Sequence, residues 1–331
     1  MGVVARVRAL WGRWWFLPLV PAAFALVLFL APWGQLRPEH LLLGAVTALL
    51  GYWGPRSKRF LVDIAPYIVV GLGYDLVRYA RRVFVTEGRV LGCGLRDVEL
   101  SLFGVGPNTT FGELVASHHV PALDLLFAVP YTIFVYLAFG YAAYLFFRDR
   151  SRMRRYLYAF AIANYVSFAC WLLIPAAPPW YVHTHGCAID LGTLPSPAGL
   201  ARVDALLGIH YFAGFYGRAA SVFGAMPSMH CAYPLIGLLT AWRVARWNTR
   251  VVHIAYALCM FFAALYLDHH WLLDAIGGWV TAFVAVALAD RLLARWPVEA
   301  AVPVPSALSA GLAPSIEQSG ALRALANQEQ T

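Results

Sequence analysis

Apolar runs near the length of a membrane span recur along most of the chain, separated by short loops rich in arginine. A helix satisfies its own backbone polar groups, and about 20 apolar residues cross the hydrocarbon of a bilayer. We therefore expect an all-α fold, a polytopic transmembrane bundle of about eight helices. The expected helices are 14–33, 40–54, 60–82, 121–147, 156–175, 223–243, 251–267 and 271–293.

Three of these helices are less regular than the others. The run at 14–33 follows arginines, as a signal peptide does, but it lacks a small-residue cleavage site and is interpreted as a retained helix. The run at 40–54 is short. The run at 60–82 carries Asp63, Asp75 and Arg78, and charges within a span are costly unless they are paired or functional.

The composition agrees with a membrane protein, because 61% of the 331 residues are hydrophobic and 13% are charged. A formal net charge of +8 is compatible with nucleic-acid binding in principle. The arginines, however, lie mainly in short loops between apolar runs, which is the pattern of positively charged cytoplasmic loops. We therefore expect a membrane environment and no nucleic-acid partner.

The arginine-rich loops also predict the orientation of the helices. Three basic clusters fall on one side, which we assign to the cytoplasm together with both termini. They are Arg148, Arg150, Arg152, Arg154 and Arg155; Arg243, Arg246 and Arg250; and Arg56, Lys58 and Arg59. Four arginines fall on the opposite side and count against this orientation, namely Arg81, Arg82, Arg89 and Arg96.

This topology leaves two long extracytoplasmic segments, at about 83–120 and 176–222. Each contains one cysteine, Cys93 and Cys187, and a disulfide between the two is left open. The chain contains no CxxC pair, so a zinc or redox motif is not indicated. Beyond residue 297 the chain loses apolar periodicity, and we expect 297–331 to be a disordered cytoplasmic tail.

Two histidine motifs lie at the outer ends of apolar runs. His230 ends the sequence Pro-Ser-Met-His near the start of the helix at 223–243, and His270 lies in the turn between 251–267 and 271–293. The topology therefore places both histidines at the outer boundary, where lipid phosphates sit. Asp274 follows His270 by four residues, so the two side chains share one helix face and are within hydrogen-bonding reach.

This combination suits phosphoryl transfer through a phosphohistidine without a metal. A neutral imidazole is a good nucleophile, and a carboxylate holds its other nitrogen in the required tautomer. A second imidazole then protonates the departing oxygen. The alternatives are an interfacial histidine at 270 and a neutral core histidine at 230. His269 competes as nucleophile, but only His270 has a carboxylate four residues later.

The segments Phe223–His230 and His269–Gly278 resemble the type 2 phosphatidic acid phosphatase superfamily. The preceding Pro178–Tyr181, Pro-Pro-Trp-Tyr, resembles the branch of fungal inositol phosphorylceramide synthases and their bacterial relatives. The resemblance covers about residues 120–290 and implies a six-helix catalytic core. It divides the chain into N-terminal membrane helices at 1–59, a phosphatidic acid phosphatase-type domain at 60–296 and the tail. It also implies that His270 is the nucleophile, Asp274 its orienting base and His230 the acid.

The chain departs from the phosphatase branch in three ways. Met229 stands where that branch usually has glycine, Ala264 where it has arginine, and Lys58 is the only lysine, so its lysine-and-arginine motif is missing. These departures favour the transferase branch and leave phosphate binding to other cations.

The candidate substrate-binding residues lie on the predicted outer side. Arg218 and the pair formed by Asp75 and Arg78, three residues apart, are the cationic candidates, with a solvated interfacial arginine as the alternative. Trp180 and Tyr181 line the headgroup pocket in one interpretation and are interfacial belt aromatics in the other. The full set is Arg218, Ser228, Asp75, Arg78, Trp180 and Tyr181.

We therefore predict an integral membrane phosphotransferase that needs neither metal nor cofactor and acts on the extracytoplasmic side. The resemblance implies transfer of phosphoinositol from a phospholipid to a lipid alcohol such as ceramide. Two alternatives stay open. The first is a lipid phosphate or prenyl diphosphate phosphatase, with water as acceptor. The second is a non-catalytic membrane lipid carrier. The sequence does not indicate an oligomeric state.

Overall fold

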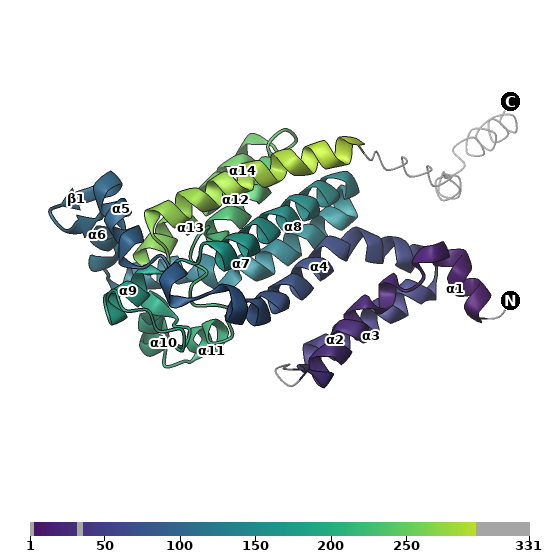
Figure 1. Cartoon of the computed structure of the whole chain (residues 1–331). Helices are drawn as coiled ribbons and strands as arrows, with labels where there is room; N and C mark the ends of the chain where they lie inside the picture. Colours follow the sequence, from purple (N-terminus) through teal and green to yellow (C-terminus); the bar gives the residue numbers. More distant parts are fainter. Residues whose placement is uncertain (1–2, 32–35, 296–331) are drawn as a thin grey trace, which may run out of the picture. The chain divides into compact units, whose positions relative to one another are not determined.

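The computed structural model describes residues 3–31 and 36–295, and the predicted tail at 297–331 lies outside them. Within these residues the chain is almost entirely helical, as predicted (Figure 1). The helices are α1 (Val3–Trp11), α2 (Val20–Leu30), α3 (Pro38–Trp53), α4 (Pro55–Phe84), α5 (Cys93–Phe103), α6 (Phe111–Ser117), α7 (Pro121–Arg148), α8 (Arg150–Leu173), α9 (Pro179–His185), α10 (Ala201–Leu207), α11 (Tyr211–Tyr216), α12 (Met229–Ala241), α13 (Trp247–Tyr266) and α14 (Leu272–Arg295). An antiparallel pair of short strands, β1 (Gly104–Gly106) and β2 (Thr109–Thr110), joins α5 to α6.

All eight predicted helices have counterparts, and five of them are long and apolar enough to cross a membrane within the described part of the chain. These five are α4, α7, α8, α13 and α14. The predicted helix at 14–33 is wrong in detail, because the segments Val7–Trp14 and Leu17–Leu30 meet at an angle of 82°. The predicted helix at 223–243 begins only at Met229, since Ser228 caps it there with its hydroxyl.

The core lies among α4, α7, α8, α12, α13 and α14, which run side by side in Figure 1. Small side chains form part of the buried face of α14. Ala282, Ala285 and Ala289 form a fully buried stripe at helical spacing, and Ala232 on α12 belongs to the same cluster. Such stripes allow backbones to approach closely within a membrane, where packing rather than water drives helix association.

The charges on α4 are paired, which explains how a helix with Asp63 and Asp75 can still be a span. Asp63 is buried and accepts hydrogen bonds from Arg150 and from Arg154, the latter at 2.7 and 2.9 Å. Asp75 is bound by Arg37 and lies 2.8 Å from the His40 ring. A paired carboxylate avoids the desolvation cost of an isolated one.

Two arginines that count against the predicted orientation have structural roles of their own. The guanidinium of Arg89 donates to the carbonyl of Phe84 at 2.7 Å and to the carbonyl of Leu173 at 2.6 Å. Phe84 is the last residue of α4, and Leu173 is the last residue of α8. A cation at a helix C-terminus satisfies free carbonyls and the helix dipole. Arg96 forms an ion pair with Glu113. Neither arginine therefore needs a cytoplasmic location.

Candidate active site

The two histidine motifs meet at one end of the core. His230 is the second residue of α12, directly after the Ser228 cap. His270 lies in the turn from α13 to α14, and Asp274 lies in the first turn of α14. The two imidazoles are in contact, since Nδ1 of His230 is 3.0 Å from Nε2 of His270. Both side chains line the same cavity.

The carboxylate of Asp274 lies beside His270, but not at hydrogen-bond distance. Its Oδ2 is 3.6 Å from Nδ1 of His270 and accepts the backbone N–H of Trp271 at 3.0 Å. The predicted approach of the two side chains is therefore present, whereas the hydrogen bond is longer than expected. Contacts of this kind tighten when substrate is bound. Asp274 is fully buried, so its charge has strong influence on the ring.

One assignment of protons satisfies every contact of the two rings. If His270 carries its proton on Nδ1, toward Asp274, its Nε2 has a free lone pair. The Nδ1–H of His230 then donates to that lone pair at 3.0 Å, and Nε2 of His230 accepts from the hydroxyl of Tyr216 at 3.3 Å. This arrangement leaves on Nε2 of His270 the lone pair that the predicted nucleophile needs.

The backbone also ties the two motifs together. The N–H of Ser228 donates to the carbonyl of Asp274 at 2.9 Å. Close by, a Cβ on Gly278 would lie 2.2 Å from the carbonyl oxygen of Ser228, so only glycine fits at this crossing. The neighbouring Gly277 has more room, with its closest contact at 3.5 Å. Gly278 therefore allows α14 to approach Ser228, the cap of the helix that carries His230.

We expect Gly278→Ala to separate the two motifs, because the added methyl group meets a backbone oxygen that cannot rotate away. The cost should be about 1–3 kcal/mol in the free energy of unfolding, with a parallel loss of activity. Thermal unfolding and activity in detergent measure both effects. Gly277→Ala is the matched control, and equal behaviour of the two variants contradicts the proposed close packing.

Aromatic side chains surround His230. The Tyr131 ring stacks on it at a centroid distance of 4.4 Å and an angle of 18°, and Phe134 lies at 4.6 Å. Both come from α7. The sequence did not indicate these neighbours, because aromatic residues within an apolar run have no distinguishing pattern. They fix the plane of the ring and keep water from one of its faces.

His269 lines the same cavity, with its ring 6.1 Å from that of His230, but its hydrogen bond goes elsewhere. Its Nε2 is 3.1 Å from the carbonyl of Pro197, and its ring stacks on Tyr131 at 5.1 Å. Burial and the neighbouring His270 lower the pKa of His269 to about 3, so its ring is neutral near pH 7. Its hydrogen bond to Pro197 supports the turn next to His270.

The cavity beside the two histidines has a volume of about 720 Å³ and is lined mostly by apolar and aromatic side chains. Four of the six predicted substrate-binding residues line it, namely Asp75, Arg78, Trp180 and Arg218. Ser228 does not, because it is fully buried and caps α12. Tyr181 does not line it either, because its fully buried hydroxyl is used by the backbone of Ala188 and Asp190.

Comparison with known proteins identifies the family. A family model described as PAP2 superfamily matches residues 103–288, more than half of the chain. The chain belongs to the PAP2 superfamily. The match includes both histidine motifs and the helices that carry them, and α3, α4 and most of α5 precede it. No solved structure matches the chain.

Named relatives narrow the assignment within the PAP2 superfamily. The phosphoinositol dihydroceramide synthase of Bacteroides thetaiotaomicron is 33% identical over 248 residues, which cover 73% of this chain and 81% of that protein. The inositol phosphorylceramide synthase of Candida albicans is 33% identical over 189 residues, covering 56% of this chain and 39% of the relative. The inositol phosphorylceramide synthase catalytic subunit of Schizosaccharomyces pombe is 29% identical over 258 residues, which cover 73% of this chain and 60% of that protein.

These matches confirm the resemblance to the inositol phosphorylceramide synthase-like branch. The chain spans less than two thirds of the length of the two fungal relatives, and most of the length of the bacterial one. Together with the five apolar helices, they establish an integral membrane enzyme of the PAP2 superfamily.

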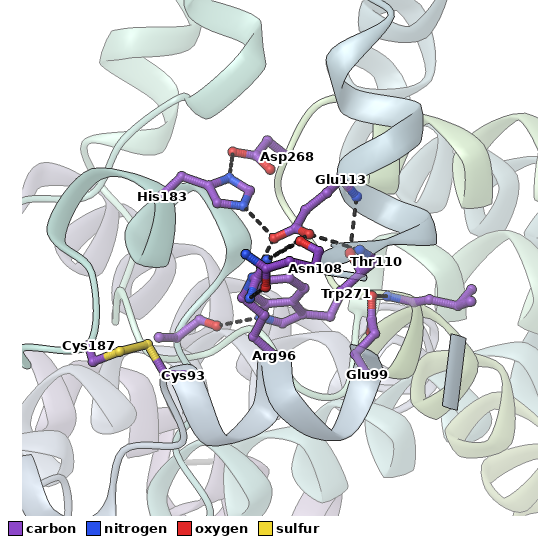
Figure 2. Close-up of polar contacts among 12 residues, drawn as sticks. Cys93, Arg96, Glu99, Asn108, Thr110, Glu113, His183, Cys187, Asp268 and Trp271 are labelled. Atoms are coloured by element: carbon purple, nitrogen blue, oxygen red, sulfur yellow. Dashed lines mark hydrogen bonds and ion pairs between the residues drawn. A yellow bond between two sulfur atoms is a disulfide. The ribbon is translucent and has the colours of Figure 1, made fainter. Parts of the chain in front are cut away.

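Outside the histidine pair, a polar network encloses the turn that carries His270 (Figure 2). Glu99 on α5 is fully buried, and its two carboxylate oxygens accept the backbone N–H groups of Leu272 and Leu273 at 3.0 and 2.9 Å. These are free N–H groups at the start of α14. Burial raises the pKa of Glu99, and the two backbone hydrogen bonds oppose that shift. Glu99 therefore fixes the helix start beside Asp274.

A second chain of contacts in Figure 2 reaches Asp268, two residues before His270. His183 lies 3.0 Å from Asp268 through Nδ1 and 3.1 Å from Glu113 through Nε2. Arg96 binds the same Glu113 at 2.5 and 3.1 Å. Asp268 itself has a φ of +61°, a left-handed conformation that needs such support. The network spans α5, α6, α9 and the turn that carries His270.

A disulfide joins two parts of this outer region. Cys93, at the start of α5, is bonded to Cys187, just after α9, and both appear at the left of Figure 2. The pairing that the sequence left open is therefore present. Glu99 and Arg96 lie on α5, and His183 lies on α9. The disulfide therefore connects the two helices that contribute these side chains to the network.

The network predicts a pH optimum for stability. The hydrogen bond with Asp268 raises the pKa of His183 above its usual 6.5, against an opposing effect of burial. Burial raises the pKa of Glu113, but hydrogen bonds from Arg96, Thr110 and His183 outweigh it and lower the value from 4.5 to about 2. A raised histidine pKa stabilises the fold below pH 6.5 and loses that effect as the pH rises through the folded value. A lowered carboxyl pKa stabilises above pH 4.5 and loses that effect as the pH falls toward 2.

We therefore expect the network to contribute most between about pH 4.5 and 6.5. The measurement is the unfolding temperature in detergent from pH 4 to 8, compared between wild type and His183→Asn. The difference between the two proteins should shrink as the pH rises above 6.5. His185→Asn, on the same short helix, is the control. A constant difference across this range contradicts the proposed ionic role of His183.

Proposed function

We propose that the chain is a membrane lipid phosphotransferase that moves phosphoinositol from a phospholipid to a ceramide-like lipid alcohol. The observation that carries the proposal is the contact of His230 with His270, beside Asp274, at the wall of a cavity large enough for a lipid headgroup. The names of the relatives supply the substrates, because they are synthases of phosphoinositol dihydroceramide and inositol phosphorylceramide.

The first half-reaction keeps the Nδ1 proton of His270 and needs one further proton on Nε2 of His230. Nε2 of His270 attacks the phosphorus of the donor and forms an N–P bond, while the bond from phosphorus to the diacylglycerol oxygen breaks. His230, in its protonated form, gives a proton to that oxygen. Asp274 stabilises the positive charge that develops on His270. Since the two nitrogens are only 3.0 Å apart, the rings must separate to admit the phosphoryl group.

The second half-reaction reverses these roles. His230 takes the proton from the acceptor hydroxyl, whose oxygen attacks the phosphorus. The N–P bond breaks, and His270 is regenerated. The product carries phosphoinositol on the acceptor oxygen. His230 regains here the proton that it gave to diacylglycerol in the first half-reaction. The apolar walls of the cavity exclude water, which favours a lipid alcohol over hydrolysis.

The developing charge on the phosphoryl oxygens requires cations, and Arg218 and Arg78 are the arginines we assign to this role. Both line the cavity, and Arg78 donates to the carbonyl of Arg218 at 2.9 Å. Arg202 is less suitable, because it is paired with Asp124 at 2.7 Å. Arginine is well suited to a phosphodiester, since its planar fork can hold two oxygens at once.

We further propose that the site faces the extracytoplasmic side, with the termini in the cytoplasm. The disulfide between Cys93 and Cys187 supports this orientation, because disulfides persist in oxidising compartments. The arginine clusters at the opposite ends of the helices support it as well. In this arrangement 1–59 supplies N-terminal membrane helices and 60–296 the catalytic domain.

The direct test is a transfer assay with purified protein. Labelled phosphatidylinositol is incubated with and without ceramide, and the products are separated and identified by mass spectrometry. We expect inositol phosphorylceramide and diacylglycerol only when ceramide is present. Release of free inositol phosphate at the same rate without ceramide indicates a phosphatase instead. No consumption of any phospholipid contradicts an enzymatic role.

A further inference from the structure

One face of α4 changes from apolar to charged along the wall of the cavity. Tyr67, Val70, Tyr74, Asp75 and Arg78 all line it, at the spacing of one helix face. Tyr67 and Arg78 are eleven residues apart, which is about 16 Å along a helix. This length exceeds the dimensions of a phosphate. The wall therefore offers an apolar part for lipid chains and a charged part for a headgroup.

The charged part is centred on Asp75. Its carboxylate is bound by Arg37, lies 2.8 Å from Nε2 of His40 and lies 3.8 Å from Nε of Arg78. His40 receives the backbone N–H of Arg37 on Nδ1 at 3.2 Å, so its proton is on Nε2 and is donated to Asp75. These contacts hold the carboxylate in a fixed orientation at the wall of the cavity.

Asp75 differs from the other buried aspartate of the same helix. Asp63 is fully covered, is bound by Arg150 and Arg154, and does not line the cavity, so it is a structural ion pair. The side chain of Asp75 keeps 13% of its surface exposed, and it lines the cavity. In addition, Nε of Arg78 is buried without a hydrogen-bond partner among the described residues. A buried donor without a partner marks a place where a ligand can bind.

The charges that line the cavity restrict which headgroup fits. Three arginines and one aspartate line it, Arg37, Arg78, Arg218 and Asp75, which leaves two positive charges when the histidines are neutral. A cationic group such as choline is repelled by the arginines, and it has no N–H or O–H to donate to the carboxylate. A neutral headgroup rich in hydroxyl groups can donate to Asp75 and accept from the arginines.

We propose that Asp75, flanked by Arg37 and Arg78, forms a subsite that selects donors with a polyol headgroup. This inference rests on the proposed function and names the recognition of its headgroup. The subsite is built by α4 and the residues at the start of α3, which precede the part matched by the PAP2 superfamily model. The residues of the subsite therefore lie in a different part of the sequence from His230 and His270, which are within the matched part.

The test compares Asp75→Asn with wild type in mixed vesicles that contain phosphatidylinositol, phosphatidylethanolamine, phosphatidylcholine and fluorescent ceramide. The readout is the ratio of products from each donor, because a ratio is independent of the fraction of folded protein. We expect the preference of wild type for phosphatidylinositol to fall by about 10- to 100-fold in Asp75→Asn, as expected for loss of a charged hydrogen-bond acceptor.

Asp63→Asn is the matched control, with the same change on the same helix. It should lower the unfolding temperature and leave the donor ratio unchanged. An equal loss with all donors in Asp75→Asn overturns the subsite, as does a wild-type preference for phosphatidylcholine.

A binding measurement separates this inference from the proposed function. If wild type transfers no headgroup, the proposed function fails, and stabilisation by short-chain phosphatidylinositol still tests the subsite. Wild type and Asp63→Asn should be stabilised more by this lipid than by short-chain phosphatidylcholine, and Asp75→Asn equally by both. Equal stabilisation of wild type by the two lipids contradicts the subsite.

Discussion

Replacing His270 with alanine is expected to lower phosphoinositol transfer by on the order of 10⁴-fold or more, the loss typical of removing a catalytic nucleophile. The reason is that no other described nitrogen combines a position beside Asp274 with direct contact to His230. A burst assay with labelled phosphatidylinositol, followed by mass spectrometry of acid-sensitive phosphohistidine, measures the loss of the intermediate directly.

Two further variants make this result specific. His119 is exposed and lies before α7, so His119→Ala should retain full activity and control for the effect of removing a histidine. His269→Ala removes the competing nucleophile and the brace on Pro197, so we expect a partial loss with the phosphohistidine still formed. If His269→Ala abolishes the phosphohistidine while His270→Ala retains it, the assignment of the nucleophile is wrong.

The sequence indicated the spanning helices that consist of one long apolar run. Runs of apolar residues indicated α7, α13 and α14 within a few residues, because each buries its backbone hydrogen bonds within one segment. The start of α12 was less predictable, since the apolar Phe223 and Ala225 belong to an irregular, buried segment that ends at the Ser228 cap. Hydropathy alone does not distinguish a buried loop from a helix.

The candidate site was predictable where its residues are close in sequence. The spacing of His270 and Asp274 indicates one helix face, and the topology placed His230 beside them. Glu99, Arg37 and His40 were missed, because they reach the site from α5 and from the start of α3. Such contacts depend on loop geometry over long sequence separations. Asp75, which binds Arg37 and His40, did have a visible signal, as a charge within an apolar run.

His230→Gln is expected to lower transfer from phosphatidylinositol by about 10²- to 10⁴-fold, the usual contribution of a general acid. The diacylglycerol oxygen is a poor leaving group without a proton, and glutamine has no proton to give at neutral pH. The loss should therefore depend on the leaving group. With the p-nitrophenyl ester of inositol phosphate, whose leaving group departs without protonation, the first step should recover to within about tenfold of wild type.

The second step should remain slow in that variant, because the acceptor hydroxyl still has no base. His230→Gln should therefore release close to one equivalent of p-nitrophenol per protein in a rapid burst, accumulate phosphohistidine at His270, and then turn over slowly even with ceramide. His270→Ala should give no burst. If His230→Gln loses the burst by the same factor as natural transfer, His230 acts by positioning His270, through their 3.0 Å contact, and not as the acid.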